Sequence, residues 1–400
     1  MACASAIAIL NCPAILSSQQ PLTRGEAIRL ALGASARVAS ISADTLAANA
    51  RLRTAREYPN PTFTASYTRS VPQNHFSVDV PLDLPGIRGS RVRAAEAGRT
   101  TARYTFLAAR AAIELGVDTM YTVAQGAIIK ASLSRATAAD AARMLADTRL
   151  RRDAGDASDL DVNLAEVSAG QAANIASADS VEAIDTRLEL QNMMGFRGDT
   201  VLVELADSLG TPGRIAGVTA TELASTPSVA AASAAVTAAR LGVVSQQRNS
   251  FGVPAVQFGV EGRDPTGAEK GVLPTIGIVL PLPLFNHNGG AVASARAELT
   301  RAQAELAVAR LEASSQLSRA YRTSAAAEAR LGRDRSILTA ATSNLTLSER
   351  GYAEGQLAIS DILEARRALH DAQAQYVTDL VAANVGAALV RVFTANGISQ

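Results

Sequence analysis

The stretch Thr275–Gly290, TIGIVLPLPLFNHNGG, changes its pattern twice within a short distance. It begins with apolar side chains at alternate positions, which is the period of a β-strand. Pro281 and Pro283 follow, and proline cannot donate a ladder hydrogen bond. From Ala291 the sequence becomes rich in alanine with helical spacing. We therefore predict a junction at which a strand ends and a long helix begins.

The same junction occurs two hundred residues earlier, in Ser77–Ser90, SVDVPLDLPGIRGS. Internal repetition of this kind predicts a duplicated architecture. The positions that mark the two strand-to-helix junctions are Pro81, Pro85, Gly89, Pro281, Pro283 and Gly289.

Composition excludes several classes of protein. The net charge is +1 over 400 residues, whereas nucleic-acid binders carry a clustered basic surface, so we expect no nucleic-acid partner. Cys3 and Cys12 are the two cysteines, which leaves little material for a disulfide framework or a thiolate metal site. The short apolar start, Met1–Ser18, is typical of a secretory signal.

We divide the chain into a signal segment, 1–20, which is degenerate or truncated, and two repeats, 21–210 and 211–400. Each repeat is expected to run helix, strand, strand, long helix, return helix. In the first repeat a short helix precedes strands at about 62–70 and 75–84, a long helix at about 86–151 and a return helix at about 158–194. In the second, a helix at about 221–249 precedes strands at about 254–262 and 272–284 and helices at about 288–351 and 358–394.

Each expected strand has one apolar and one polar face, and is long enough to cross a bilayer when tilted. Four strands cannot close a barrel, and open strand edges are not tolerated in hydrocarbon. Either several chains share one barrel, or the strands form a small water-exposed sheet on a coiled coil. The long helices that leave the strand ends favour the shared barrel.

These residues resemble those of a known family. The duplicated strand–strand–long-helix plan, the Tyr58–Pro61 motif YPNP and the PLPLFN junction look like the TolC-type outer-membrane efflux proteins. The junction motifs DLPGIRG and LPLFNHNGG look most like the CzcC/CusC-type branch, which serves heavy-metal export. The likeness covers nearly all of Pro21–Phe393.

The resemblance implies a mixed α and β membrane protein: a homotrimer with a twelve-stranded transmembrane β-barrel, four strands from each chain, and a long α-helical periplasmic barrel. It implies an outer-membrane channel of a Gram-negative bacterium, surrounded by outer-membrane lipid. Its partners would be a periplasmic membrane-fusion adaptor and an inner-membrane transporter of the resistance–nodulation–division class. The channel would conduct substrates passively, with heavy-metal cations as candidate cargo.

The turn between the last two helices is similar to the family's periplasmic tip, YxxGxxxxxDxLxA. It reads RGYAEGQLAISDILE over Arg350–Glu364, and the positions that match are Tyr352, Gly355, Asp361, Leu363 and Ala365. In the family, acidic residues after this turn line the constriction, which points to Asp361 and Glu364. Asp156, Asp159 and Asp161 of the first turn would add to them. Adaptor docking is expected at Gly155, Gly355 and Tyr352.

Other interpretations remain. Aspartates at a helix start also cap helices, so Asp161 and Asp361 could serve as caps instead of gate residues. Arg350, Arg366 and Arg367 are close enough in sequence to pair with the acids and hold the tip closed. A coiled-coil scaffold without channel activity, periplasmic or secreted, and an exit duct for drugs or type I secretion are the alternative functions.

Catalysis has little support in the sequence. It contains no glycine-rich phosphate loop at a strand-to-helix turn and no nucleophile-elbow motif. His75, His287 and His370 are isolated from one another, so we expect no metal site, no cofactor and no enzyme activity.

Overall fold

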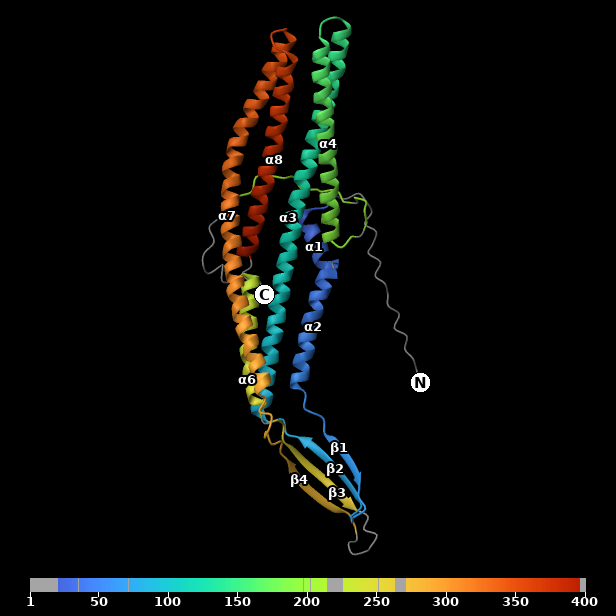
Figure 1. Cartoon of the computed structure of the whole chain (residues 1–400), viewed down its shortest axis with the longest axis vertical. Helices are drawn as coiled ribbons and strands as arrows, with labels where there is room; N and C mark the ends of the chain where they lie inside the picture. Colours follow the sequence, from blue (N-terminus) through green and yellow to red (C-terminus); the bar gives the residue numbers. More distant parts are fainter. Residues whose placement is uncertain are drawn as a thin grey trace, which may run out of the picture. The chain divides into compact units, whose positions relative to one another are not determined.

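The computed structural model describes residues 21–34, 36–70, 72–196, 198–201, 203–213, 226–250, 252–262 and 271–395. The expected signal segment 1–20, with Cys3 and Cys12, lies outside these residues, as does the expected start of the helix at 221. The elements, coloured along the chain in Figure 1, are α1 (Arg24–Ala34), α2 (Ala36–Arg56), β1 (Thr62–Tyr67), β2 (Asn74–Pro81), α3 (Pro85–Asp153), α4 (Asp159–Met193), α6 (Pro227–Arg248), β3 (Ala255–Gly262), β4 (Leu273–Val279), α7 (Gly289–Ala353) and α8 (Ile359–Ala395).

The four strands form one antiparallel sheet in the order β1-β2-β3-β4. Its central pairing joins the two halves of the sequence, since Val78 of β2 lies opposite Phe258 of β3. Three strands end earlier than the sequence predicted, and one of them is β2, which stops at Pro81 instead of about 84. β1 stops at Tyr67 because Thr68 turns the chain, its hydroxyl donating to the carbonyl of Ser70 over 3.0 Å. β4 stops at Val279, before the prolines of its junction.

The register gives the sheet one apolar and one polar face. Phe63, Phe76, Val78, Phe258 and Ile276 share one face through direct cross-strand pairing or alternation. That face is open: Ile276 is 79% exposed and Phe63 is 65% exposed. The opposite face carries small and polar side chains, including Thr64, Ser77, Gln257, Gly259 and Thr275.

Of the junction prolines and glycines, Pro85, Gly89 and Gly289 lie at the helix starts, whereas Pro81 is the last residue of β2. Pro85 is the first residue of α3, a position where its missing N–H costs nothing. Gly89 lies within the first turns of α3, whereas Gly289 is the first residue of α7. Asn288, just before α7, has a positive φ of 61°, and its side-chain amide donates to the carbonyl of Gln246 over 2.8 Å.

The chain divides into two compact units, and both contain residues from both sequence repeats. One unit comprises Met1–Ser35, Gly116–Gly213 and Thr323–Gly386. The other comprises Ala36–Leu115, Arg214–Arg322 and Ala387–Gln400, and it holds the sheet. The repeats therefore differ from the spatial units, because each long helix passes from one unit into the other.

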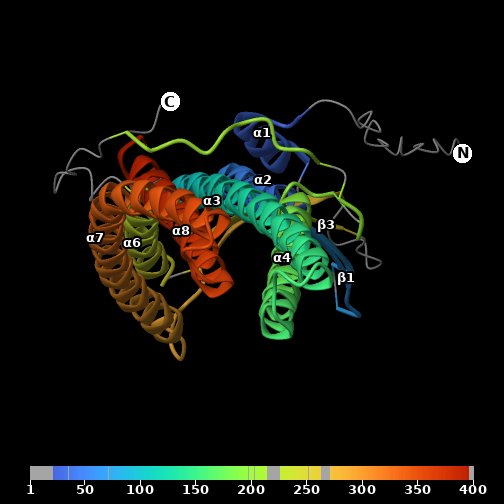
Figure 2. The same ribbon diagram turned by 90° about the horizontal axis from the view of Figure 1, so that it is seen from above.

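Small residues allow the helices of the first unit to approach closely. Gly126 of α3 faces α8, where an added Cβ would clash with the side chain of Val381, and Figure 2 shows α8 lying against α3. Ala327, Leu331, Leu380 and Ala383 form a buried cluster between α7 and α8. Alanine and glycine thus act here as interface residues.

Among the described residues, one helix is long and apolar enough to pass a length-and-composition test for a membrane span. It is α6, and 6% of its most apolar window is buried within the chain.

Candidate functional site

The two helical hairpins of the first unit, α3–α4 and α7–α8, end in turns with the same backbone (Figure 1). At the end of α3 the N–H of Gly155 donates to the carbonyl of Arg152, and the N–H of Asp156 donates to that of Arg151. This hydrogen-bond pair defines a Schellman C-cap, which needs a residue in the left-handed region. Gly155 supplies it, with a φ of 89°.

The second turn repeats this geometry at the end of α7. Gly355, with a φ of 74°, donates its N–H to the carbonyl of Tyr352, and Gln356 donates to that of Gly351. Leu357 then folds back onto Gly351, where any side chain would collide with it. The sequence-predicted tip glycines therefore lie at the two turning points of the hairpins.

The helix that follows the first turn has a complete capping box. The Asp161 N–H donates to Ser158 Oγ over 3.2 Å, and the Ser158 N–H donates to Asp161 Oδ2 over 2.9 Å. The backbone and side-chain hydrogen bonds from Ser158 hold the pKa of the Asp161 carboxyl below its ordinary value. Asp161 thus makes the capping contacts that the sequence left as an alternative to a gate.

The helix that follows the second turn, α8, has only one of the two hydrogen bonds of a capping box. Ala358 stands where Ser158 stands in the first hairpin, and its N–H donates to Asp361 Oδ2 over 3.0 Å. Without a hydroxyl at position 358, the Asp361 N–H has no side-chain acceptor there. Asp361 is exposed and so is Glu364, which leaves both carboxylates open to solvent within the chain.

Aromatic and aliphatic contacts connect the two tips. The guanidinium carbon of Arg151 lies 4.7 Å from the centre of the Tyr352 ring, an attractive cation–π distance. Tyr352 also packs on a buried cluster that joins the hairpins and is formed by Met144, Ala165, Ile359 and Ile362. Tyr352 therefore faces the other hairpin at the tip.

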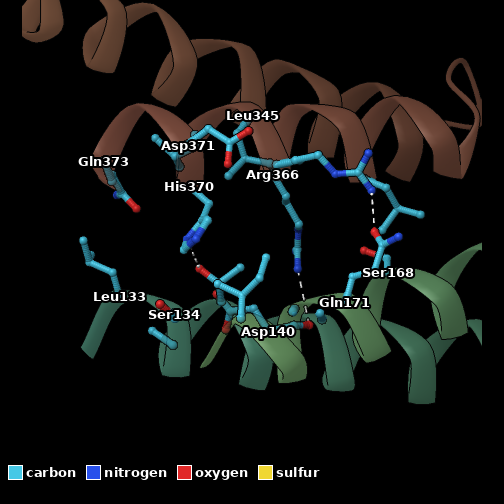
Figure 3. Close-up of a pocket in the computed structure, with 18 of the residues that line it drawn as sticks. Leu133, Ser134, Asp140, Ser168, Gln171, Leu345, Arg366, His370, Asp371 and Gln373 are labelled. Atoms are coloured by element: carbon cyan, nitrogen blue, oxygen red, sulfur yellow. Dashed lines mark hydrogen bonds between the residues drawn. The ribbon is translucent and has the colours of Figure 1, made fainter. Parts of the chain in front are cut away.

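The tip arginines make different pairs from the ones expected. Arg366 binds Glu349 over 3.1 Å and donates to the Asp140 carbonyl over 3.3 Å. Arg367 donates to Gln171 Oε1 over 3.0 Å (Figure 3). The prediction that these side chains pair with Asp361 and Glu364 was wrong for Arg366 and Arg367, since both reach across to other helices.

These arginines line a cavity of about 340 Å³ between the hairpins (Figure 3). His370 of α8 points into it, with Nδ1 lying 3.3 Å from the hydroxyl of Thr137 on α3. Asp159 lies away from the cavity, 88% exposed, with its carboxylate 3.8 Å from Arg152. The sequence-predicted acids therefore sit at the hairpin ends and not in this cavity.

The three histidines lie apart. His75 is on β2, 3.4 Å from Glu261 of β3, whereas His287 precedes α7 and His370 is on α8. Within the described ranges no group of three histidine, cysteine, aspartate or glutamate side chains is arranged to hold a metal ion.

The sequence of the chain is similar to that of known efflux proteins. Residues 219–395 match the model of the outer membrane efflux protein family. The cobalt-zinc-cadmium resistance protein CzcC of Cupriavidus metallidurans is 26% identical over 369 residues, which is 89% of this chain and 86% of that protein.

Solved structures share the fold over nearly the whole chain. A membrane protein from Pseudomonas aeruginosa has a TM-score of 0.79 at 20% identity, covering 92% of this chain and 93% of its own. CusC gives 0.77 at 14% identity, covering 93% and 91%, and the CmeC outer membrane channel of Campylobacter jejuni gives 0.79 at 14%, covering 94% and 86%.

These findings define the class: the chain is an outer-membrane channel component of a tripartite efflux system, with a TolC-like fold of mixed α and β structure. Residues 219–395 match the outer membrane efflux protein family, and over most of its length the chain is similar in sequence to CzcC and in fold to CusC. It resides in the outer membrane of a Gram-negative bacterium and extends into the periplasm. The resemblance that the two junctions and the tip motif carried is thereby confirmed.

Proposed function

We propose that three copies of this chain form the exit duct of a metal-cation efflux pump, and that the duct closes at the hairpin tips. The observation that carries the proposal is the sheet, an amphipathic set of four strands with its apolar face exposed and with β1 and β4 at its edges. In lipid each edge must be paired, and pairing β1 of one copy with β4 of the next satisfies both. Three sheets joined in this way close a twelve-stranded barrel whose polar faces line the lumen.

The helices would continue the duct into the periplasm. α3 has 69 residues and α7 has 65, so each contour spans on the order of 100 Å at the α-helical rise. Chemical work would come from an inner-membrane transporter of the resistance–nodulation–division class, and the chain itself would perform no catalysis. A periplasmic adaptor would dock on the turns around Gly155, Gly355 and Tyr352.

The gate would be formed by Asp361 and Glu364, with Asp159 and Asp161 adding to the field. Repeated three times around an axis, exposed carboxylates become acidic rings, which favour cations in channels. The capping contact of Asp361 is compatible with this role, because one oxygen binds the Ala358 N–H and the side chain remains exposed. Heavy-metal cations are the proposed cargo on the strength of the likeness to the resistance protein CzcC.

The gate can be separated from the cap by two sets of variants in planar bilayers. D361A with E364A removes the charges and the cap together, whereas D361N with E364Q keeps an oxygen that can accept from Ala358. If the charges form the gate, both sets lower cation selectivity of the channel or raise its conductance. An effect confined to the alanine set, or none in either set, would contradict the gate and leave Asp361 as a cap.

The shared barrel has its own test. With Cys3 and Cys12 replaced by serine, single cysteines placed at successive positions of β1 and of β4 should include pairs that cross-link neighbouring copies into dimers and trimers, because barrel closure staggers the register between copies. The product should be a heat-modifiable trimer from outer-membrane extracts. A monomer released into osmotic-shock fluid would instead support the periplasmic scaffold.

A further inference from the structure

The second unit has a pocket at the first strand-to-helix junction, where the end of α2 meets the start of α3. Its volume is about 580 Å³. Its lining is dominated by charged side chains and consists of Arg56, Tyr58, Asp83, Pro85, Arg88, Gly89, Val92, Arg93 and Glu96. We call it the junction pocket.

The charges in and beside the junction pocket do not balance. Asp83 binds Arg91 over 2.8 Å, and Glu96 binds Arg56 over 2.8 Å, so each acid has a guanidinium of its own. Arg88 Nε also lies 3.5 Å from Asp83 Oδ2, so the guanidiniums of Arg56, Arg88, Arg91 and Arg93 outnumber the two carboxylates by two. Such a surplus in a concave site attracts an anion.

The guanidiniums are more exposed to solvent than the carboxylate that they bind. The Asp83 side chain is 0% exposed, whereas those of Arg88 and Arg91 are 35% and 33% exposed. Arg88 uses one terminal nitrogen on the Arg56 carbonyl, over 2.9 Å. Its Nε is buried and lies 3.5 Å from Asp83 Oδ2, so this nitrogen faces the carboxylate. The Arg88 side chain is 35% exposed, and its remaining terminal N–H groups are the donors that it can offer to a phosphate.

Apolar surface leads directly to the pocket. Val80, Leu82 and Leu84 are exposed along the chain that runs from the open face of the sheet to Asp83. Tyr58, 66% exposed, lines the pocket, with the Arg88 guanidinium carbon 4.4 Å from its ring centre. Tyrosine and arginine next to an apolar band are typical of the level at which lipid headgroups meet water.

We propose that the junction pocket binds the phosphate of a phospholipid in the periplasmic leaflet of the outer membrane. Arg88 and Arg93 contact the phosphate, Tyr58 packs beside the headgroup, and the acyl chains follow Val80, Leu82 and Leu84 along the sheet. This rests on the proposed barrel, because only a membrane-embedded sheet brings its apolar face to lipid.

The second junction provides an internal contrast. Two hundred residues after Asp83, Arg88, Arg91 and Arg93 stand Pro283, Asn288, Ala291 and Ala293. The first junction therefore binds one lipid per chain, and the second, which lacks these guanidiniums, binds none.

Native mass spectrometry of the full-length protein in detergent, titrated with phosphatidylglycerol or phosphatidylethanolamine, tests this. The R88Q/R93Q variant should weaken lipid binding by at least about tenfold, since charge-assisted hydrogen bonds to phosphate are lost. R88K/R93K, which keeps the charges, should retain most of it. The control R296Q/R301Q removes two arginines from α7 and should bind lipid as the parent does.

Equal lipid retention in R88Q/R93Q and in the control would overturn the proposal. So would inorganic phosphate displacing the lipid at a comparable concentration, because the site would then serve a free anion. The same spectra report the oligomeric mass. Absence of a trimer would count against the shared barrel. A trimer whose lipid binding is the same with and without Arg88 and Arg93 would count against the lipid site alone.

Discussion

The two hairpins of the first unit use different chemistry at the same place in the repeat. In α3–α4, the Ser134 hydroxyl of α3 donates to the Asp179 carboxylate of α4. Two hundred residues later the pair is Asp334 on α7 and Asp379 on α8. Asp379 also binds Arg330 over 2.6 Å and accepts from Gln375 over 3.1 Å. The second hairpin thus replaces a neutral donor with an acid and adds a guanidinium.

The difference introduces a dependence on protons. A serine hydroxyl donates at any pH, but an aspartate can donate to another carboxylate only when it is protonated. Burial, and then the charge of Asp379, raise the pKa of Asp334. Burial also raises the pKa of Asp379, but hydrogen bonds from Gln375 and Arg330 outweigh it and leave that pKa lowered. The folded state therefore holds the Asp334 proton more tightly than an ordinary aspartate does, whereas Asp379 loses its proton more readily.

The largest expected effect comes from removing the guanidinium that the second hairpin added. Arg330→Met leaves Asp379, whose side chain is 3% exposed, as an uncompensated buried charge. We expect a loss of about 3–5 kcal/mol in the free energy of unfolding at neutral pH. Lys130→Met, at the equivalent position of α3, should cost less than about 1 kcal/mol. Guanidinium chloride unfolding followed by circular dichroism measures both, and equal losses would remove the distinction between the hairpins.

The next effect is in the pH dependence of stability. Because Asp334 has a raised pKa in the folded state, its contribution is complete below the unfolded-state value and is lost as pH rises through the folded-state pKa. Asp334→Ser copies the first hairpin and should remove this component. At a pH of about 8 the variant should be more stable than the parent by about 1–2 kcal/mol, with the difference shrinking towards acid pH.

The reciprocal change is the matched control. Ser134→Asp should give the first hairpin an acid pair and a new loss of stability as pH rises. Identical pH profiles for the parent and Asp334→Ser would show that the Asp334 proton has no role in the contact.

The smallest effect is expected at the caps. Ala358→Ser would complete at α8 the box that Ser158 and Asp161 form at α4, and should stabilise the helix start by about 0.5–1 kcal/mol. Ser158→Ala should cost a similar amount at α4. Hydrogen exchange of the amides in the first turn of each helix resolves the two sites. Slower exchange at α8 in Ala358→Ser is the expected result, and unchanged exchange would mean that this serine does not cap.

Local features were predictable from the sequence because they depend on neighbouring residues. The alternation around Ile276, the glycines of the two turns and the offset between the repeats all act within a few positions. Strand ends were less accurate, since the apolar alternation continues to Leu284 although the prolines end pairing at Val279.

Long-range charge pairs required the structure. Asp379 lies three residues after Tyr376 and four before Ala383, two positions of the seven-residue apolar pattern of α8. This spacing indicates that an acid lies on the packed face of the helix. Its partners Arg330 and Asp334 belong to another helix. The ion pairs Asp83–Arg91 and Arg56–Glu96 could not be assigned to one pocket from the sequence. That pocket forms only where the end of α2 packs against the start of α3.

The interleaving of the two repeats in each compact unit bears on how the chain folds after it crosses the inner membrane. Strand β2 can pair with β3 only after about 180 further residues have crossed the membrane, because Val78 of β2 lies opposite Phe258 of β3. Contacts so distant in sequence form slowly, and unpaired apolar strands are prone to aggregate in the meantime. Until the second half has emerged, the first half is an incomplete intermediate with an open strand edge. We therefore expect the apolar strands of the first half to be exposed to aggregation until β3 has been delivered.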